Sequence, residues 1–305
     1  MVRHLLRLSH PFSLTCLNVG CPGNAENLVS DTRNLQITEL IVDRLRRPNM
    51  IRLATRLALG PRLSALKIEE HDSTELYPSF LHNPGHKFDS LRHLQVFQPV
   101  EEADMTNFLS FLASCPQLSH LRISHSYSSR PKPAFLLPPT SIPHLSFFDA
   151  PYGIARLLVH GRPVLSLKLR CAVKSDLQRE TLSQLAEGST PLRGLDVDHV
   201  EWRDDVLLDV AEYFPALQDL KLRVVKYDYC NLLLKRLDSD MKRLPSMQRF
   251  FTYNFTARRP EEDFGSDTLR LLEVTNDRLT SIGFRLKTER YRDERRWVLL
   301  PLSQI

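Results

Sequence analysis

The stretch QLSHLRI, residues 117 to 123, decides the fold because the same phrase returns along the chain. It reads L-x-x-L-x-[ILV], where x is any residue. Clear copies are RLSALKI (62–68), SLRHLQV (90–96), PLRGLDV (191–197) and ALQDLKL (216–222), and a proline stands within two residues before the first leucine in most of them. A phrase repeated this closely indicates a protein built from similar structural units.

Less regular copies extend the series: SLTCLNV, QITELIV, HLSFFDA, PVLSLKL, SMQRFFT and TLRLLEV. The first apolar residues of successive copies lie 19 to 30 residues apart, and most of these intervals are typical of leucine-rich repeats. These anchor residues are Leu14, Ile37, Leu63, Leu91, Leu118, Leu145, Val164, Leu192, Leu217, Met247 and Leu269.

The pattern within each unit predicts a strand followed by a helix. On a strand, the last two apolar residues of the phrase point to one side and their neighbours point to the other. Segments with helical spacing separate the phrases, and most end shortly before a proline, which stops a helix. These segments are MIRLATRLAL (50–59), TNFLSFLASC (106–115), LQRETLSQLAEG (177–188), DVLLDVAEYF (205–214) and NLLLKRLDSDMKRL (231–244).

A strand and a return helix repeated in this way predict an α/β leucine-rich-repeat solenoid. Its curved parallel sheet would line the concave face, and its helices would cover the convex face. We expect residues 1–305 to form a single domain of about eleven irregular repeats, with the last ~25 residues as a C-terminal cap. The cap would hold the run RLKTERYRDERRW (285–297), whose interleaved charges favour a solvated strand or hairpin.

The composition is that of a globular protein, with 42% hydrophobic and 25% charged residues. A formal net charge of +5 permits nucleic-acid binding but does not call for it. We expect no signal peptide and no membrane contact, because no apolar run is long enough. Five irregularly spaced cysteines without a CxxC pair argue against disulfides and zinc, so we expect a cytoplasmic or nuclear protein.

One glycine-containing stretch, FFDAPYGIARLLVHGRP (147–163), invites comparison with a phosphate-binding loop. Such a loop needs clustered glycines that open a longer helix, with a lysine in register. Here the two glycines are eight residues apart and no lysine is present. We therefore predict a turn at 151–153, a short helix at 154–159 and a turn at 160–163.

No group of residues predicts catalysis or metal binding. The stretch 71–73 reads His-Asp-Ser, but consecutive side chains diverge and cannot form a catalytic triad. The acidic residues beside it lack the spacing of a metal site. Glu101, Glu102 and Asp104 stand at the start of a predicted helix, where negative charge is stabilising. We expect no catalytic residue, no metal and no cofactor, and we predict that the protein is not an enzyme.

Three stretches resemble phrases of fungal F-box proteins, in which leucine-rich repeats follow an N-terminal F-box. They are IPHLSFFDAPYGIARLLVHGRPVLSLKL (142–169), FLASCPQLSHLRI (111–123) and AEYFPALQDLKL (211–222). The resemblance implies a region that recognises substrates for a ubiquitin ligase. No F-box phrase of the leucine-proline-x-glutamate type is visible, so we expect contact with a ubiquitin-ligase adaptor only if an F-box is missing from this chain.

The concave face is where we expect a partner to bind, because its outward side chains are held rigidly by the sheet. The strand register selects ten positions, which form a mixed-charge band suited to a protein of complementary pattern. They are Lys67, Glu69, Gln95, Arg122, Lys168, Arg170, Asp196, Asp198, Lys221 and Arg223.

We predict a non-enzymatic, monomeric protein-protein interaction module. The alternative is a basic repeat protein that binds RNA, which would show strongly salt-dependent binding. A third possible function is a hydrolase built on the repeat fold, and the only residues that favour it are the His-Asp-Ser stretch at 71–73.

Overall fold

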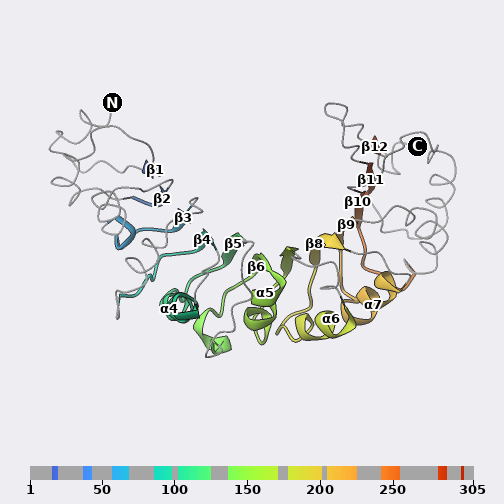
Figure 1. The fold of residues 1–305 in the computed structure, drawn as a ribbon, viewed down its shortest axis with the longest axis horizontal. Coiled ribbons are helices and arrows are strands. Elements are labelled where there is room, and N and C mark those ends of the chain that lie inside the picture. The colour runs from blue at the N-terminus through green and yellow to red at the C-terminus, as the bar shows by residue number, and fades with distance from the viewer. Residues whose placement is uncertain are drawn as a thin grey trace. The chain divides into compact units, whose positions relative to one another are not determined.

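The protein divides into two compact units, Met1–Phe147 (unit 1) and Phe148–Ile305 (unit 2). Figure 1 draws their elements. The computed structural model describes residues 16–19, 37–42, 57–68, 86–97, 102–124, 137–170, 178–200, 205–224, 242–254, 281–286 and 297–298.

Unit 1 contains a parallel sheet whose strand order follows the chain order. Helix α4 (Glu102–Ala113) connects its last two strands, and a 3-10 helix, η3 (Pro139–Ser141), comes later in the chain. The strands are β1 (Cys16–Val19), β2 (Glu39–Val42), β3 (Ala65–Ile68), β4 (His93–Phe97) and β5 (His120–Ser124).

Unit 2 follows the same plan, with strand order again equal to chain order. Strand β6 (Phe147–Pro151) begins at the last residue of unit 1. The strands after it are β7 (Ser166–Arg170), β8 (Gly194–Val200), β9 (Asp219–Val224), β10 (Arg249–Asn254), β11 (Ser281–Leu286) and β12 (Trp297–Val298). Strands β7 to β11 pair in parallel, whereas β12 pairs antiparallel with β11.

Three helices of unit 2 lie side by side along one side of its strands (Figure 1). They are α5 (Tyr152–Val159), α6 (Arg179–Leu185) and α7 (Val206–Tyr213). Each follows a strand and precedes the next one, so the described part of the chain is an α/β structure of parallel strands connected through helices.

A shared turn leads into the strands. In the opening phrase, the amide of Leu118 donates to the carbonyl of Cys115 over 3.1 Å, and Pro116 stands between them. Proline suits this second turn position because its φ is already fixed near the required value. The same bond closes five other turns: Leu63 to Gly60, Leu91 to Phe88, Leu145 to Ile142, Leu217 to Phe214 and Met247 to Leu244.

A second recurring contact links each repeat to the one before it. The amides of Ser119 and His120 both donate to the carbonyl of Arg92, at 3.0 and 2.9 Å. The amides of Arg92 and His93 share the carbonyl of Ser64 in the same way. Unit 2 repeats the pattern, since the amides of Gln218 and Asp219 share the carbonyl of Arg193. The sequence period therefore corresponds to a real translational repeat of backbone contacts.

The apolar positions of the phrase form the core, as the strand reading predicts. Leu118, Leu121 and Ile123 are completely buried, and so are their counterparts in the phrase ALQDLKL (216–222). Helix α4 adds Phe108 and Leu112, which are also completely buried. Removing one such side chain from water stabilises the fold by roughly 1.5–3 kcal/mol, so the repeats are held mainly by these residues.

Some element boundaries differ from the sequence prediction. Helix α5 begins at Tyr152, not at residue 154, and Pro151 is its N-cap residue, with φ −58° and ψ 145°. Proline is tolerated at the start of a helix because no amide hydrogen is needed there. Helix α4 begins at Glu102, four residues before the apolar segment that predicted it. The predicted helix at 231–244 lies outside the described residues except for its last three positions, which are not helical.

The predicted phrase at Leu269 also lies outside the described residues. Beyond β10 the next described strand is β11, which pairs with β10 in parallel and which none of the predicted phrases covers. The sequence LTSIGF (279–284) fits the repeat pattern with isoleucine and phenylalanine in place of the second and third apolar residues. The described part of the chain holds no helix with the length and apolar character that crossing a membrane would require.

Candidate functional site

The candidate site is the outward face of the strands, the side opposite the buried phrase residues. In β4 and β5, buried residues alternate strictly with exposed or half-buried ones. Strand β7 shows the same alternation. Because successive strands pair without a shift over most of their length, equivalent outward positions stand next to one another in rows.

The structure places nine of the ten predicted positions on described strands. In unit 1, Lys67 lies opposite Gln95, and Gln95 lies opposite Arg122, so these three form one row. Glu69 lies outside the described residues. In unit 2 a corresponding row consists of Lys168, Asp196 and Lys221, and the remaining positions are Arg170, Asp198 and Arg223.

The charges of unit 2 pair with one another. Lys168 Nζ lies 3.5 Å from Asp196 Oδ2, and Arg223 Nε lies 2.9 Å from Asp198 Oδ1. Lys221 is exposed, and its Nζ lies 5.8 Å from the ring centroid of Phe251, within cation–π range. The alternating positive and negative charges were predicted to match the charges of a partner protein. In the structure they also form ion pairs within unit 2.

Sequence reasoning missed Asp149, the most buried acid of this group. Its side chain is 3% exposed, and its two carboxylate oxygens accept bonds of 2.8 and 2.9 Å from Nε and Nη2 of Arg170. Burial acts to lower the pKa of Arg170, but Asp149, with Asp198 and Asp196 behind it, raises that pKa overall. The signal that could have identified Asp149 is an acidic residue within the otherwise apolar phrase HLSFFDA (144–150). An acid in a strand either faces outward or forms an ion pair.

The outward face of unit 1 carries a row of rings. His93 and His120 stand opposite each other on β4 and β5, with ring centroids 4.5 Å apart and planes at 83°. Phe147 stacks on His120, with centroids 5.6 Å apart and planes at 24°. Sequence reasoning did not select these residues, although they occupy the same phrase position as Ala65 in the strand before.

The hydrogen bonds of Ser119 define the neutral tautomer of His120. The Ser119 hydroxyl donates to the carbonyl of Arg92 over 3.2 Å, and it also lies 2.9 Å from His120 Nδ1. With the single hydroxyl hydrogen donated to the Arg92 carbonyl, Nδ1 is the donor to Ser119 Oγ. Burial, and then the neighbouring His93, lower the pKa of His120. The neutral His120 ring consequently keeps its lone pair on Nε2.

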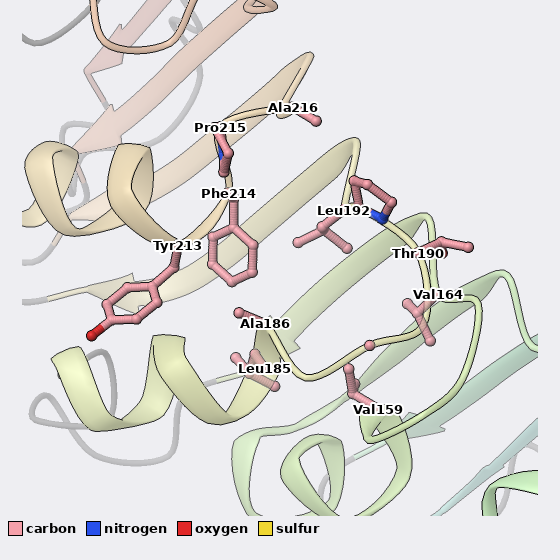
Figure 2. A pocket seen from close by; sticks show the side chains of 12 residues that line it. Val159, Val164, Leu185, Ala186, Thr190, Leu192, Tyr213, Phe214, Pro215 and Ala216 are labelled. Carbon is pink, nitrogen blue, oxygen red and sulfur yellow. The ribbon is translucent and has the colours of Figure 1, made fainter.

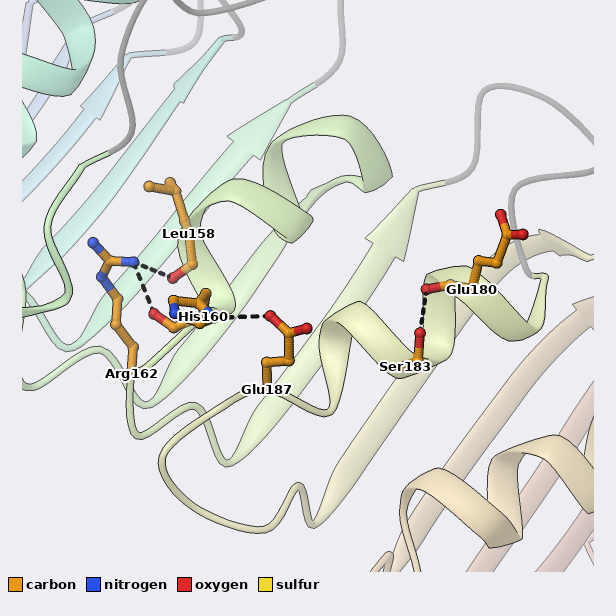
Figure 3. Close-up of polar contacts among 6 residues, drawn as sticks. All are labelled: Leu158, His160, Arg162, Glu180, Ser183 and Glu187. Carbon is orange, nitrogen blue, oxygen red and sulfur yellow. Dashed lines mark hydrogen bonds and ion pairs between the residues drawn. The ribbon is translucent and has the colours of Figure 1, made fainter.

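The glycine-containing stretch forms a structural connector, as predicted. Gly161 has φ 67°, a left-handed conformation that favours glycine. Arg162 is buried, and its guanidinium turns back to donate to the carbonyls of Leu158 and His160 at the end of α5, over 2.9 and 3.4 Å (Figure 3). Burial lowers the pKa of Arg162 to about 10. These bonds satisfy carbonyls that the helix leaves open at its C-terminus.

The same turn also contacts the next repeat. The amide of Gly161 donates to the carbonyl of Glu187 over 2.9 Å, and His160 Nδ1 lies 2.8 Å from the Glu187 carboxylate (Figure 3). The carbonyl of Arg162 accepts from the amide of Ser189. The turn is therefore held on both sides by backbone and side-chain contacts, which explains why this short interval still stacks in register.

A small pocket lies in unit 2 between the turns that lead into β8 and β9 (Figure 2). Its walls are apolar, with Val159, Leu185, Leu192 and Phe214 among them, and its cavity volume is about 40 Å³. Sites for cofactors and drug-sized ligands measure roughly 300–1,000 Å³. The pocket is therefore too small to hold a cofactor or a drug-sized ligand.

The residues considered for chemistry contribute little to a site. The stretch 71–73 lies outside the described residues, and the side chains of Glu102 and Asp104 are not described. Within the described ranges, no group of three or more His, Cys, Asp or Glu residues could hold a metal ion. Cys115 is buried, and burial raises the pKa of its thiol to about 12, which opposes formation of the reactive thiolate.

No protein-family model matches this sequence, and no curated protein matches it.

Proposed function

We propose that the protein is a leucine-rich-repeat solenoid that binds another protein through the outward, concave face of its sheet. In this proposal it has no catalytic activity, and it acts as the substrate-recognition region of a ubiquitin ligase, as its resemblance to fungal F-box proteins suggests. Docking to a ligase adaptor would require an F-box outside this chain.

The observation that carries the proposal is the register of the outward positions. Lys67, Gln95 and Arg122 come from three separate repeats and stand in one row on a rigid sheet. Such a row presents spaced polar groups without the entropy loss of ordering a loop, which favours recognition of a protein surface.

The charge arrangement of unit 2 supports a protein partner over RNA. A phosphate backbone binds best to a continuous run of cations. In unit 2, however, the outward cations Lys168, Arg170 and Arg223 each contact a carboxylate of the same unit. A surface of alternating signs is better matched by a partner with alternating signs.

The test is an affinity pull-down with the double variant R122E/K221E. Both side chains are exposed, so the reversal disturbs the core little. The matched control is R156E/R193E, which makes the same charge change at exposed positions on α5 and in the turn before β8. We expect R122E/K221E to lose a discrete protein partner that the wild type and the control retain. Identical partner sets for all three proteins would contradict the proposal, provided that circular dichroism shows them folded.

A further inference from the structure

The outward face of unit 1 differs in charge from that of unit 2. Strands β3, β4 and β5 present eight described outward side chains: Ala65, Lys67, His93, Gln95, Phe97, His120, Arg122 and Ser124. The ionisable ones among these eight are all bases. The acid on the neighbouring strand β2 is Glu39, which stands in the row of His93 with Ala65 between them.

The two histidines form the centre of this face. Both rings are exposed, and they contact each other across neighbouring strands at 4.5 Å. Two imidazolium ions at this separation repel each other, and this repulsion from His93 adds to the larger effect of burial in lowering the pKa of His120. A carboxylate placed against the pair would remove this repulsion and accept hydrogen bonds from both rings.

The neighbouring groups add positive potential. Arg122 follows His120 on the same face of β5, and Lys67 stands two strands away in the same row as Arg122. Arg92 is exposed in the turn before β4. In unit 2, the first acid of β6, Asp149, is bonded to Arg170. Lys67 and Arg122 make contacts of their own, and their positive charges also raise the electrostatic potential around His93 and His120.

We propose that His93 and His120 form a proton-dependent binding site for an acidic peptide segment of a protein partner. The partner's carboxylates would bind at the edges of the two imidazole rings, with Lys67 and Arg122 nearby. Binding would take up protons, and affinity would therefore rise as the pH falls through the range in which histidine titrates. This inference rests on the proposed function and names the partner chemistry for one part of that surface.

The ring geometry favours carboxylates over nucleic-acid bases. A base-stacking platform offers open ring faces. Here Phe147 already stacks on a face of His120, and the His93 and His120 rings meet nearly at right angles. Ring edges with nitrogen atoms are better placed for hydrogen bonds to oxygen acceptors.

The experiment measures fluorescence anisotropy of a labelled peptide of alternating aspartate and serine, with an asparagine–serine peptide as the uncharged control. Binding to the full chain is measured at about pH 5.5 and about pH 7.5, on either side of the ordinary histidine pKa of about 6.5. Ionic strength is constant and EDTA is present, so that metal ions held by imidazole do not contribute. The variants are H93Q/H120Q and, as the matched control, H144Q, which removes an exposed histidine of the same unit.

We expect the wild type and H144Q to bind the aspartate peptide roughly tenfold more tightly at the lower pH, since uptake of up to two protons is linked to binding. H93Q/H120Q should bind equally weakly at both pH values. Tightening that survives in H93Q/H120Q, or equal binding of the asparagine peptide, would overturn the inference. So would an oligouridylate RNA that binds more tightly than the peptide at both pH values and is weakened by H93Q/H120Q.

The two proposals can fail separately. If R122E/K221E loses a protein partner while H93Q/H120Q retains it at both pH values, the interaction surface stands and the histidine site is wrong. If the peptide titration behaves as expected while no partner depends on Arg122 and Lys221, the histidine site stands and the wider surface is wrong. Thermal unfolding of each variant at both pH values establishes that a loss of binding is not a loss of folding.

Discussion

The guanidinium of Arg170 and the buried carboxylate of Asp149 form a two-point ion pair between neighbouring strands, with Nε–Oδ1 and Nη2–Oδ2 distances of 2.8 and 2.9 Å. A planar guanidinium matches a carboxylate in this geometry, and the two parallel bonds fix the orientation of both side chains. Arg170 was predicted to contact a partner, and in the structure it also holds β7 against β6.

Replacing Asp149 by asparagine should destabilise unit 2 substantially. The change leaves the half-buried Arg170 without its nearest negative charge, and breaking a buried pair costs about 3–5 kcal/mol. Urea unfolding followed by circular dichroism measures the difference. The comparison variant is Asp196→Asn, whose pair with Lys168 is longer, at 3.5 Å, and more open to water. That change should cost less than about 1 kcal/mol, and equal losses in the two variants would contradict the assignment.

Alanine substitutions at two glycines of the same stretch should have opposite effects. At Gly161, φ is 67°, so a side chain is strained there and G161A should cost about 1–2 kcal/mol. Gly153 lies within α5, and a Cβ at that position meets no atom within 4 Å. G153A should therefore stabilise the protein by up to about 1 kcal/mol. Thermal unfolding of the two variants gives the sign of each effect, and a stabilising G161A would contradict the left-handed conformation of Gly161.

We expect Arg162 to stabilise the C-terminal end of α5 and not to bind a ligand. Replacing it by methionine removes the donors to the Leu158 and His160 carbonyls and should cost about 1–3 kcal/mol. Arg156 on the same helix is exposed, and R156M should change stability by no more than about 0.5 kcal/mol. Chemical denaturation distinguishes the two positions. A loss of partner binding without a loss of stability in R162M would instead indicate a binding role.

The thiol of Cys115 should be protected from alkylation in the folded protein. It should also make the folded protein less stable at high pH. Its pKa is raised by burial from 9.0 to about 12, and its Sγ donates to the Phe111 carbonyl over 3.3 Å. Between these two values the unfolded chain loses the proton while the folded chain keeps it, so stability declines as pH rises above about 9. In C115A that part of the decline should disappear.

Alkylation by iodoacetamide, mapped by mass spectrometry, checks the same residue independently. Cys115 should react only after denaturant is added, because the thiolate is the reactive form and burial opposes it. Rapid labelling of Cys115 in the folded protein at about pH 8 would contradict both the burial and the raised pKa.

The sequence alone was sufficient for the parts of the fold that depend on local pattern. The spacing of Leu118, Leu121 and Ile123 identifies a strand with one buried side, and the burial of all three confirms it. Pro116 marks the turn before that strand because proline suits only a few backbone conformations. Helix boundaries were less predictable: Tyr152 and Gly153, which the sequence placed in a turn, belong to α5 because Pro151 is tolerated at the N-cap position just before them.

Tertiary structure decided which outward side chains meet. His93 and His120 are 27 residues apart, and Asp149 and Arg170 are 21 apart. A strand period tells which side a residue faces, but not which residue of the next strand stands beside it or which rotamer brings two charges together. The sequence therefore determined the repeat, its period and its core. The pairing of acids with bases in unit 2 and of rings in unit 1 arose only when the strands aligned, because those contacts depend on register between distant segments.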